Sequence, residues 1–344
     1  MAVTITAPTT SVANTLFAFN HNTFKITGLA SGEQVSVTIT TSGVTYTDTR
    51  NADTDGACSI EVSAYLQSLF CRQNSREPNV QDDFQTSISS TISITSEGGA
   101  TGTYNYTIIY GALNYGETYT AYTSNLHLWG AYPSARQTFV FNNNTGYTSG
   151  WSLNTQNLDG TTGSESITLY EGYNVLRPVT LLSQRGLLHA DTMGIYLTNS
   201  SARYSLTFDL CMCDGVLLRW VDRMGNWQYW LFEKGDETIT TANYGEEIDT
   251  PYRASNLSLY GSRRQGKSIG TQIACCQPLC DRSMFDFLCG IMGSPHVSWF
   301  DGKSQAWIPV QVSADKSTWA RDQHAQLQDF TLSIVLPETL TQRL

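Results

Sequence analysis

Residues 216–232, VLLRWVDRMGNWQYWLF, decide the fold, because they form the pattern of a β-hairpin that is apolar on both faces. They hold three of the eight tryptophans of the chain. Trp220 points to one face, and beyond the turn at 222–226 the residues Trp227 and Tyr229 alternate with Trp230. A sheet with one face in water alternates apolar with polar residues. The hairpin is therefore expected either at the centre of a sandwich or under a second subunit.

The composition around this hairpin predicts an all-β protein. Only 15% of the 344 residues are charged, and the chain contains 18 Tyr and 13 Phe. Such a composition, rich in Ser, Thr, Asn and Gly, is typical of many short strands joined by polar turns. The formal net charge of −10 excludes a nucleic-acid backbone as the expected partner, because phosphate binding needs a basic stripe.

The alternating segments predict two or three β-sandwich-like domains with one short C-terminal capping helix. We expect an N-terminal β domain at 1–112, with hairpins at 34–47 and 88–110 and a short helix that Ser63 would cap. Glycines and asparagines break residues 113–200 into short strands, which favours a middle, loop-rich β domain. Residues 201–344 form the C-terminal β domain, with the tryptophan hairpin and a helix at about 280–292.

The N-terminus has no basic region followed by an apolar core, and no long apolar run occurs elsewhere. We therefore expect neither a secretory signal peptide nor membrane insertion. The eight cysteines would then face a reducing cytosol. Cys211-x-Cys213 and Cys275-Cys276-x-x-x-Cys280 leave zinc open as an alternative, but they lack paired C-x-x-C spacing and a nearby His, so buried thiols are preferred.

The sequence contains no catalytic motif that fits a known arrangement of nucleophile, base and orienting group. None of the five histidines lies in a nucleophile elbow or a zinc motif. The carboxylates at 236–237 and 246–249 could serve a glycosidase as a pair, although solvated surface charge explains them better. Arg263 and Arg264 form a small basic cluster, which we interpret as an interface rim facing acidic surface rather than as a phosphate site.

Three parts of the chain together resemble tail proteins of phages and prophages of Bacteroidetes. Residues 217–232 resemble the hairpin pattern LxWxNRxGGWxxWLF of that group, with Gly225-Asn226 where the pattern has Gly-Gly. Residues 294–297, 307–312 and 327–332 are similar to its C-terminal strands, and 56–62, 65–70 and 110–113 to its N-terminal half. The resemblance covers both ends of the chain but not the middle.

This resemblance implies a non-enzymatic virion structural protein of the distal-tail or tail-tip type, without a cofactor, assembled in the host bacterial cytoplasm. Its expected partners are other virion tail proteins and further copies in a homo-oligomeric ring, with a host surface glycan as a further candidate. The candidate subunit interface consists of Trp220, Trp227, Tyr229, Trp230, Arg263 and Arg264. Three alternatives stay open. The chain's own middle domain would cover the second hairpin face, or the protein is a carbohydrate-binding adhesin module, or it is a glycan-degrading tail enzyme.

Overall fold

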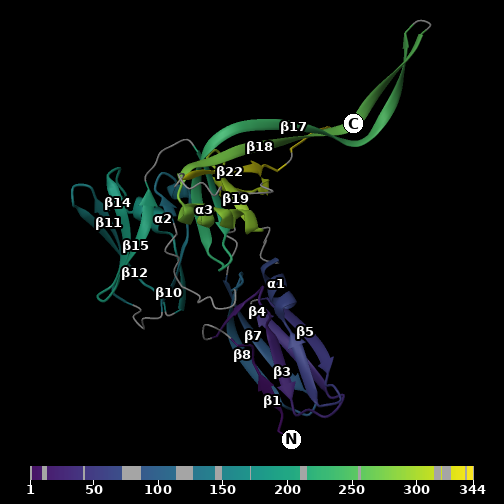
Figure 1. The fold of residues 1–344 in the computed structure, drawn as a ribbon, viewed down its shortest axis with the longest axis vertical. Coiled ribbons are helices and arrows are strands. Elements are labelled where there is room, and N and C mark those ends of the chain that lie inside the picture. The colour runs from purple at the N-terminus through teal and green to yellow at the C-terminus, as the bar shows by residue number, and fades with distance from the viewer. Residues whose placement is uncertain are drawn as a thin grey trace. The chain divides into compact units, whose positions relative to one another are not determined.

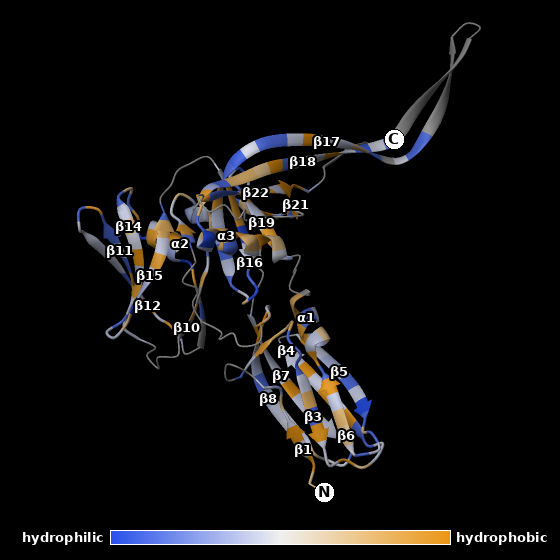
Figure 2. Ribbon diagram, in the orientation of Figure 1, coloured by the Kyte–Doolittle hydropathy of each residue, from blue (hydrophilic) through white to orange (hydrophobic). Residues whose placement is uncertain are grey.

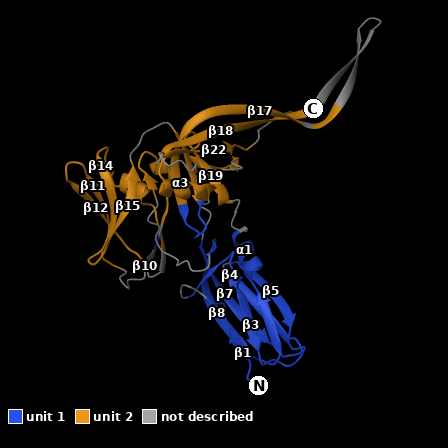
Figure 3. Ribbon diagram, in the orientation of Figure 1, with its two compact units in different colours: residues 1–123, 140–142, 221–227 blue, residues 124–139, 143–220, 228–344 orange. Residues whose placement is uncertain are grey.

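The computed structural model describes residues 2–9, 14–41, 43–71, 87–113, 127–143, 149–170, 172–209, 215–254, 257–313, 319, 327–337 and 339–343 (Figure 1). The protein is all-β, as predicted, with several sheets and a few short helices. The chain divides into two compact units (Figure 3). Unit 1 comprises Met1–Thr123, Val140–Asn142 and Val221–Trp227, and unit 2 comprises Ser124–Phe139, Asn143–Trp220 and Gln228–Leu344.

Unit 1 contains two sheets that share one hydrophobic core. Their strand orders are β1-β3-β6 and β2-β8-β7-β4-β5. The predicted hairpins at 34–47 and 88–110 are confirmed as β4–β5 and β7–β8. Figure 2 shows apolar bands alternating along β4 and β7, as expected for strands with one face on a core. The elements are β1 (Thr4–Thr6), β2 (Thr15–Phe17), β3 (Thr23–Thr27), β4 (Gln34–Thr41), β5 (Val44–Asn51), β6 (Ala57–Glu61), α1 (Ser63–Cys71), β7 (Ser87–Ser96) and β8 (Thr101–Ile109).

Helix α1 begins one residue earlier than the sequence predicts. Ser63 is the first residue of the helix and not its N-cap, the residue that precedes the helix. The N–H groups of Tyr65 and Leu66 donate to the carbonyl of Val62. The hydroxyl of Ser63 is engaged with the loop before β3, described below. The helix is present as predicted, but the Ser63 side chain binds the loop before β3 instead of capping the helix.

Unit 2 contains a five-stranded sheet of order β12-β11-β14-β15-β9 and a larger sheet of order β20-β19-β16-β17-β18-β22-β21, with β23 also paired to β18. Strand β15 pairs with β14, so the first sheet spans the predicted domain boundary at 200. Its strands are β9 (His127–Trp129), β11 (Trp151–Asn157), β12 (Thr162–Ile167), β14 (Thr192–Thr198) and β15 (Arg203–Asp209). Between these strands in the sequence come η1 (Pro133–Ala135), β10 (Phe139–Asn143), β13 (Gly172–Leu176) and α2 (Pro178–Gln184), and the central residues of β10 belong to unit 1. Helix α2 was not predicted in this loop-rich part of the chain; Pro178 favours it, because proline suits the first turn of a helix.

The tryptophan hairpin is confirmed as β16 (Gly215–Val221) and the start of β17 (Trp227–Ala254), which are neighbours in the larger sheet. The predicted helix is confirmed as α3 (Arg282–Cys289), continued by η2 (Gly290–Gly293); the Asp281 carboxylate caps it by accepting a hydrogen bond from Met284 N–H. The remaining strands are β18 (Leu257–Cys280), β19 (Val297–Asp301), β20 (Ala306–Pro309), β21 (Gln311–Ser313), β22 (Gln328–Val335) and β23 (Thr339–Arg343).

The sequence did not predict the length of the next hairpin. Strand β17 is 28 residues long and β18 is 24, and Figure 1 shows the pair extending well beyond the sheet of unit 2 that it starts from. We call the paired residues from Glu233 of β17 to Cys276 of β18 the arm. From Glu233 to Asn243 every residue of β17 is exposed. A strand that is exposed on both faces does not alternate apolar with polar residues. That alternation is the signal by which a strand is predicted from a sequence, so the arm was not predicted.

Candidate functional site

One face of the tryptophan hairpin packs against α3 and β9 of the same unit. The rings of Trp220 and Trp230 lie 5.4 Å and 5.9 Å from the ring of Phe287 on α3. Trp230 also lies 5.7 Å from Trp129 and 5.2 Å from His127. These edge-on and tilted contacts are typical of aromatic packing in a core.

The other face of the hairpin is covered by residues 133–139 and β20. The hydroxyl of Tyr229 accepts a hydrogen bond from Thr138 N–H at 2.9 Å, and its ring lies 6.0 Å from Trp307. The guanidinium of Arg219 lies over the Trp307 ring, 4.5 Å from its centre. Trp307 in turn donates from Nε1 to the carbonyl of Ala135 at 2.8 Å. The chain therefore covers both faces itself.

This packing bears on the predicted subunit interface. In the single chain, Trp220, Trp227, Tyr229 and Trp230 are 1%, 5%, 0% and 7% exposed. A neighbouring subunit would find almost no surface of these side chains to cover, so we do not propose them as an interface. Residues 127–138, inside the predicted middle domain, contact both faces of the hairpin. This favours the alternative in which the chain's own middle domain covers the second face. Arg263 and Arg264 lie in β18, and their side chains are outside the described part of the structure.

The turn of the tryptophan hairpin belongs to unit 1, where it meets the end of β8. The Asp222 carboxylate accepts hydrogen bonds from the N–H groups of Met224 and Asn226, and Gly225 adopts φ +80°. The N–H of Ala112 donates to the carbonyl of Arg223 at 2.6 Å. A Cβ on Gly225 would lie 2.5 Å from a methyl carbon of Ile109. Both the conformation and the close approach require glycine here.

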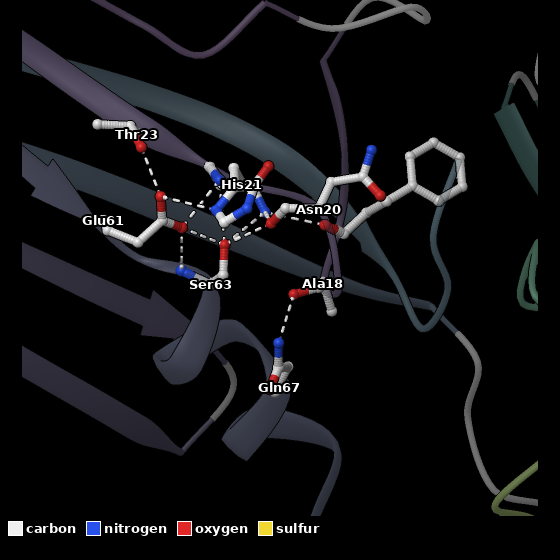
Figure 4. Close-up of polar contacts among 9 residues, drawn as sticks. Ala18, Asn20, His21, Thr23, Glu61, Ser63 and Gln67 are labelled. Carbon is white, nitrogen blue, oxygen red and sulfur yellow. Dashed lines mark hydrogen bonds and ion pairs between the residues drawn. The ribbon is translucent and has the colours of Figure 1, made fainter. Parts of the chain in front are cut away.

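A polar cluster joins the loop before β3 to the start of α1 (Figure 4). The Glu61 carboxylate accepts hydrogen bonds from the Thr23 hydroxyl, from Asn22 N–H at 2.9 Å and from Ser63 N–H at 3.2 Å. The Ser63 hydroxyl accepts from Asn22 N–H at 3.0 Å and can donate to Glu61 or to the Asn20 carbonyl. Burial pushes the pKa of Glu61 upward, but the hydrogen bonds from Ser63, Thr23 and Asn22 outweigh it and hold that pKa below its usual value.

This cluster contains Ser, His and Glu, but it lacks the contact that activates a nucleophile. His21 Nδ1 lies 3.9 Å from Glu61 Oε2, and its side chain is fully exposed. The Ser63 hydroxyl is hydrogen bonded to Asn20, Asn22 and Glu61, whereas an activated serine donates to a histidine base. Gln67 adds a further link from α1 to the loop by donating to the Ala18 carbonyl at 3.1 Å. The arrangement is suited to bracing α1.

Two of the three cysteines of β18 lie in the core, and Cys276 is partly exposed. Cys275 and Cys280 are 1% and 0% exposed, and burial, with a contribution from Cys276, raises the pKa of Cys275 to about 12. A thiol with such a pKa is a poor nucleophile and a poor metal ligand, because both roles need the thiolate. In the part of the chain that the structure describes, no group of three or more His, Cys, Asp or Glu could hold a metal ion. Cys211 and Cys213 lie outside that part.

The candidate carboxylates lie along the arm. Asp236 and Glu237 are at one end of its exposed stretch and Glu246 and Glu247 at the other, all on β17. At about 3.3 Å per residue the two pairs are separated by roughly 30 Å. A glycosidase needs two carboxyl groups within about 10 Å of each other. These two pairs therefore cannot act together in one chain, and Glu237 is instead paired with Lys234 at 3.1 Å.

Comparison with known proteins gives no family. No family model matches the chain, and no curated protein matches it. Among solved structures, it is similar to a 1.5-MDa bacterial ice-binding adhesin that is retained at the host cell surface (10% identity, covering 80% of this chain and 92% of that chain, TM-score 0.16). It is also similar to invasin, a bacterial integrin-binding protein (10% identity, covering 79% of this chain and 57% of that chain, TM-score 0.18). A third similar structure is a tetra-tandem repeat from the extending region of a large adhesion protein (15% identity, covering 82% of this chain and 85% of that chain, TM-score 0.24). TM-scores this low carry no argument about function. Among the described residues, no helix is long and apolar enough to cross a membrane.

Proposed function

We propose that this chain is a non-enzymatic structural protein of a virion tail, of the distal-tail or tail-tip type, which assembles with copies of itself and with other tail proteins. The resemblance of residues 217–232 and of both chain ends to such proteins motivates the class. The arm supports the other part of the proposal, which is assembly with copies of the chain and with other proteins. We infer that the arm, and not the tryptophan hairpin, makes the contacts between subunits.

The observation that carries this proposal is the two-stranded end of the arm. Strand β18 is flanked by β22 and β23 only from Gly266 to Cys280. Farther out, residues 247–254 pair with residues 257–264 and, in the described part of the chain, with no third strand. A two-stranded ribbon is at best marginally stable in water, so a ribbon this long is expected to pack on another protein.

The buried tryptophan hairpin has a different role in this proposal. Its aromatic rings join β16, β17, α3 and β20 into a rigid base from which the arm starts. A rigid base positions an extended element more accurately than a flexible loop does. The arm would then reach a neighbouring subunit while the body stays folded.

The test is to shorten the arm and leave the base intact. In one variant, residues 247–264 are replaced by a two-residue Asn-Gly turn, which suits a two-residue hairpin connection. We expect a folded protein with the wild-type melting temperature that no longer assembles, as measured by analytical ultracentrifugation and electron microscopy. A wild-type protein that stays monomeric at high concentration and binds no tail protein would contradict the proposal.

A carbohydrate-binding adhesin module is the alternative function. Sugar-binding modules of this kind stack sugar rings on exposed aromatic side chains. The tryptophan hairpin does not supply such a platform, because its rings are buried. Among the described residues, Phe19 and Tyr170 are the markedly exposed aromatic side chains, and they lie in different units. Binding of the purified protein to a glycan array, lost on changing Tyr170 to Ala, would favour this alternative.

A further inference from the structure

The five-stranded sheet and the larger sheet of unit 2 meet at strand β9. Its three residues form the outermost strand of the five-stranded sheet and pair in parallel with β15. The rings of His127 and Trp129 stack on each other, with their centres 4.5 Å apart. Both rings also contact Trp230 of β17 edge-on, at 5.2 Å and 5.7 Å. We call these three rings the β9 junction; it connects the two sheets by aromatic packing.

Two ring nitrogens of the β9 junction are buried and have no hydrogen-bond partner in the described part of the chain. They are Nε2 of His127 and Nε1 of Trp129. Buried polar atoms nearly always have a partner, because an unpaired one has given up its hydrogen bonds to water without replacement. The cost is smallest while the ring is neutral and rises steeply for a charged group. The stability of the junction therefore depends on His127 being uncharged.

Protonation of His127 would add to this cost. Whichever nitrogen carries the hydrogen in the neutral ring, both nitrogens of the protonated ring are donors, so Nε2 would hold a hydrogen without an acceptor. The positive charge would also lie against the indole rings of Trp129 and Trp230 instead of water. Burial accordingly lowers the pKa of His127 from its usual value of 6.5, although the negative charge of Asp209 on β15 acts in the opposite direction.

The other charged side chains on the elements around the junction, within the described part of the chain, do not supply an acceptor to Nε2. They lie on β15, β16, α3 and the start of β17, and are Arg203, Arg219, Arg282, Asp286, Glu233 and Lys234. The three arginines and the lysine contact other side chains instead. The Trp129 ring would attract a cation, but it offers a π face and not a full hydrogen-bond acceptor. A protonated His127 would therefore stay without a full partner.

We propose that the β9 junction is a pH-sensitive contact, which opens more often when His127 takes up a proton and lets β9 come away from β15 and β17 before either sheet unfolds. Strand β9 pairs over three residues, whereas β11 and β14 pair with each other over six. Elements with few hydrogen bonds to the rest of a fold open locally at a lower free energy than its central strands. The inference concerns the body of unit 2 and is independent of assembly through the arm.

Other contacts hold β9 closed at neutral pH and confine the opening in acid. Leu128, between the two aromatic residues of β9, is fully buried, so the open state is a minor one. The hydrogen bond from Thr138 N–H to the Tyr229 hydroxyl contains no group that titrates between about pH 4 and pH 9. The hydrogen bond from Trp307 to the Ala135 carbonyl contains none either. Both therefore persist in acid and keep the segment after β9 in place.

The sign of the pH dependence follows from the two pKa values of His127. In the open state the ring is in water and its pKa is near 6.5, whereas in the closed junction its pKa is lower. The open state therefore binds more protons, and the closed state loses stability as the pH falls from the open-state value to the closed-state value. At about pH 5 the ratio of open to closed states should be several-fold higher than at pH 7. It should be at most about 30-fold higher, which is the limit set by an open-state pKa of 6.5.

Hydrogen exchange on the full-length chain measures this opening. The N–H of Gly130, at the end of β9, donates to the Asp209 carbonyl at 2.7 Å, so it exchanges when β9 leaves β15. We expect its protection factor, corrected for the intrinsic pH dependence of exchange, to fall several-fold from pH 7 to about pH 5, while β11 and β14 keep theirs. Unchanged protection of β9 would overturn the proposal. An equal loss in β11 and β14 would also overturn it, because the sheet would then open as a whole.

Two glutamine variants identify the responsible group. His127→Gln keeps a polar side chain that does not titrate, so the fall in Gly130 protection between pH 7 and about pH 5 should disappear. His296→Gln is the matched control, because burial also lowers the pKa of His296, and this variant should respond to acid as the wild type does. A response that survives His127→Gln, or one that is lost in His296→Gln, would contradict the role of His127.

A titration of the wild-type chain gives a measurement that needs no variant. The NMR signal of the His127 ring reports its pKa directly, and we expect a value below 6.5. A value of 6.5 or above would mean that the closed junction accommodates the protonated ring as well as the neutral one. That result would overturn the proposal even if His127→Gln failed to fold.

Discussion

The glycine at position 225 shows how much a single residue contributes to this fold. Its φ of +80° is unfavourable for any residue with a Cβ, and an added Cβ would lie 2.5 Å from a methyl carbon of Ile109. We expect Gly225→Ala to lower the free energy of unfolding by about 1–3 kcal/mol, measured by urea denaturation. Gly43→Ala is the matched control, because Gly43 has φ +82° with no atom within 4 Å of an added Cβ. Equal losses in the two variants would show that the contact with Ile109 adds nothing.

The Glu61 carboxylate contributes to how the stability of unit 1 responds to acid. Its pKa is held below the usual value in the folded protein, so its contribution to stability is present above the unfolded-state pKa, near 4.3. That contribution is lost as the pH falls through the lower, folded-state pKa. We expect Glu61→Gln to be less stable than the wild type at pH 7, and the difference to shrink below about pH 4. Denaturation curves from pH 3 to 7 measure it; a constant difference across that range would rule out the carboxylate as the cause.

At the scale of elements, the tryptophan hairpin behaves as a core element. Trp230 is 7% exposed and packs on Phe287, Trp129 and His127. We expect Trp230→Ala to cost about 3–5 kcal/mol of folding stability and to lower the melting temperature of the chain at every protein concentration. The exposed Tyr170 is the control, since Tyr170→Ala should change stability by less than about 0.5 kcal/mol. A Trp230→Ala protein that melts like the wild type but fails to assemble would restore the hairpin as an interface.

At the scale of the whole molecule, sequence reasoning succeeded where a buried face leaves a periodic pattern. The hairpins β4–β5 and β7–β8 and the helix α3 were predictable, because their apolar residues recur with the period of the element, and the hairpin β16–β17 was predictable from two short apolar runs joined by a turn. The residues that cover the tryptophan hairpin were not predictable from the sequence, since Thr138 and Trp307 contact Tyr229 from distant parts of the chain. The arm was missed for the opposite reason. Its exposed residues have no apolar period, so the sequence indicates only solvated surface charge at Asp236, Glu237, Glu246 and Glu247.

The hairpin turn at 221–227 also has an evolutionary consequence. Unit 1 is built from the N-terminal segment, residues 140–142 and this turn, which lies far downstream in the chain, and the Ala112–Arg223 hydrogen bond joins the N-terminal segment to the turn. Recombination at a single junction after residue 113 would transfer the N-terminal segment without the piece that its last strand contacts. The unit is therefore not an exchangeable module, and the N-terminal segment and the turn are expected to be inherited together, with substitutions at Ile109 and Gly111 constrained by those in the turn.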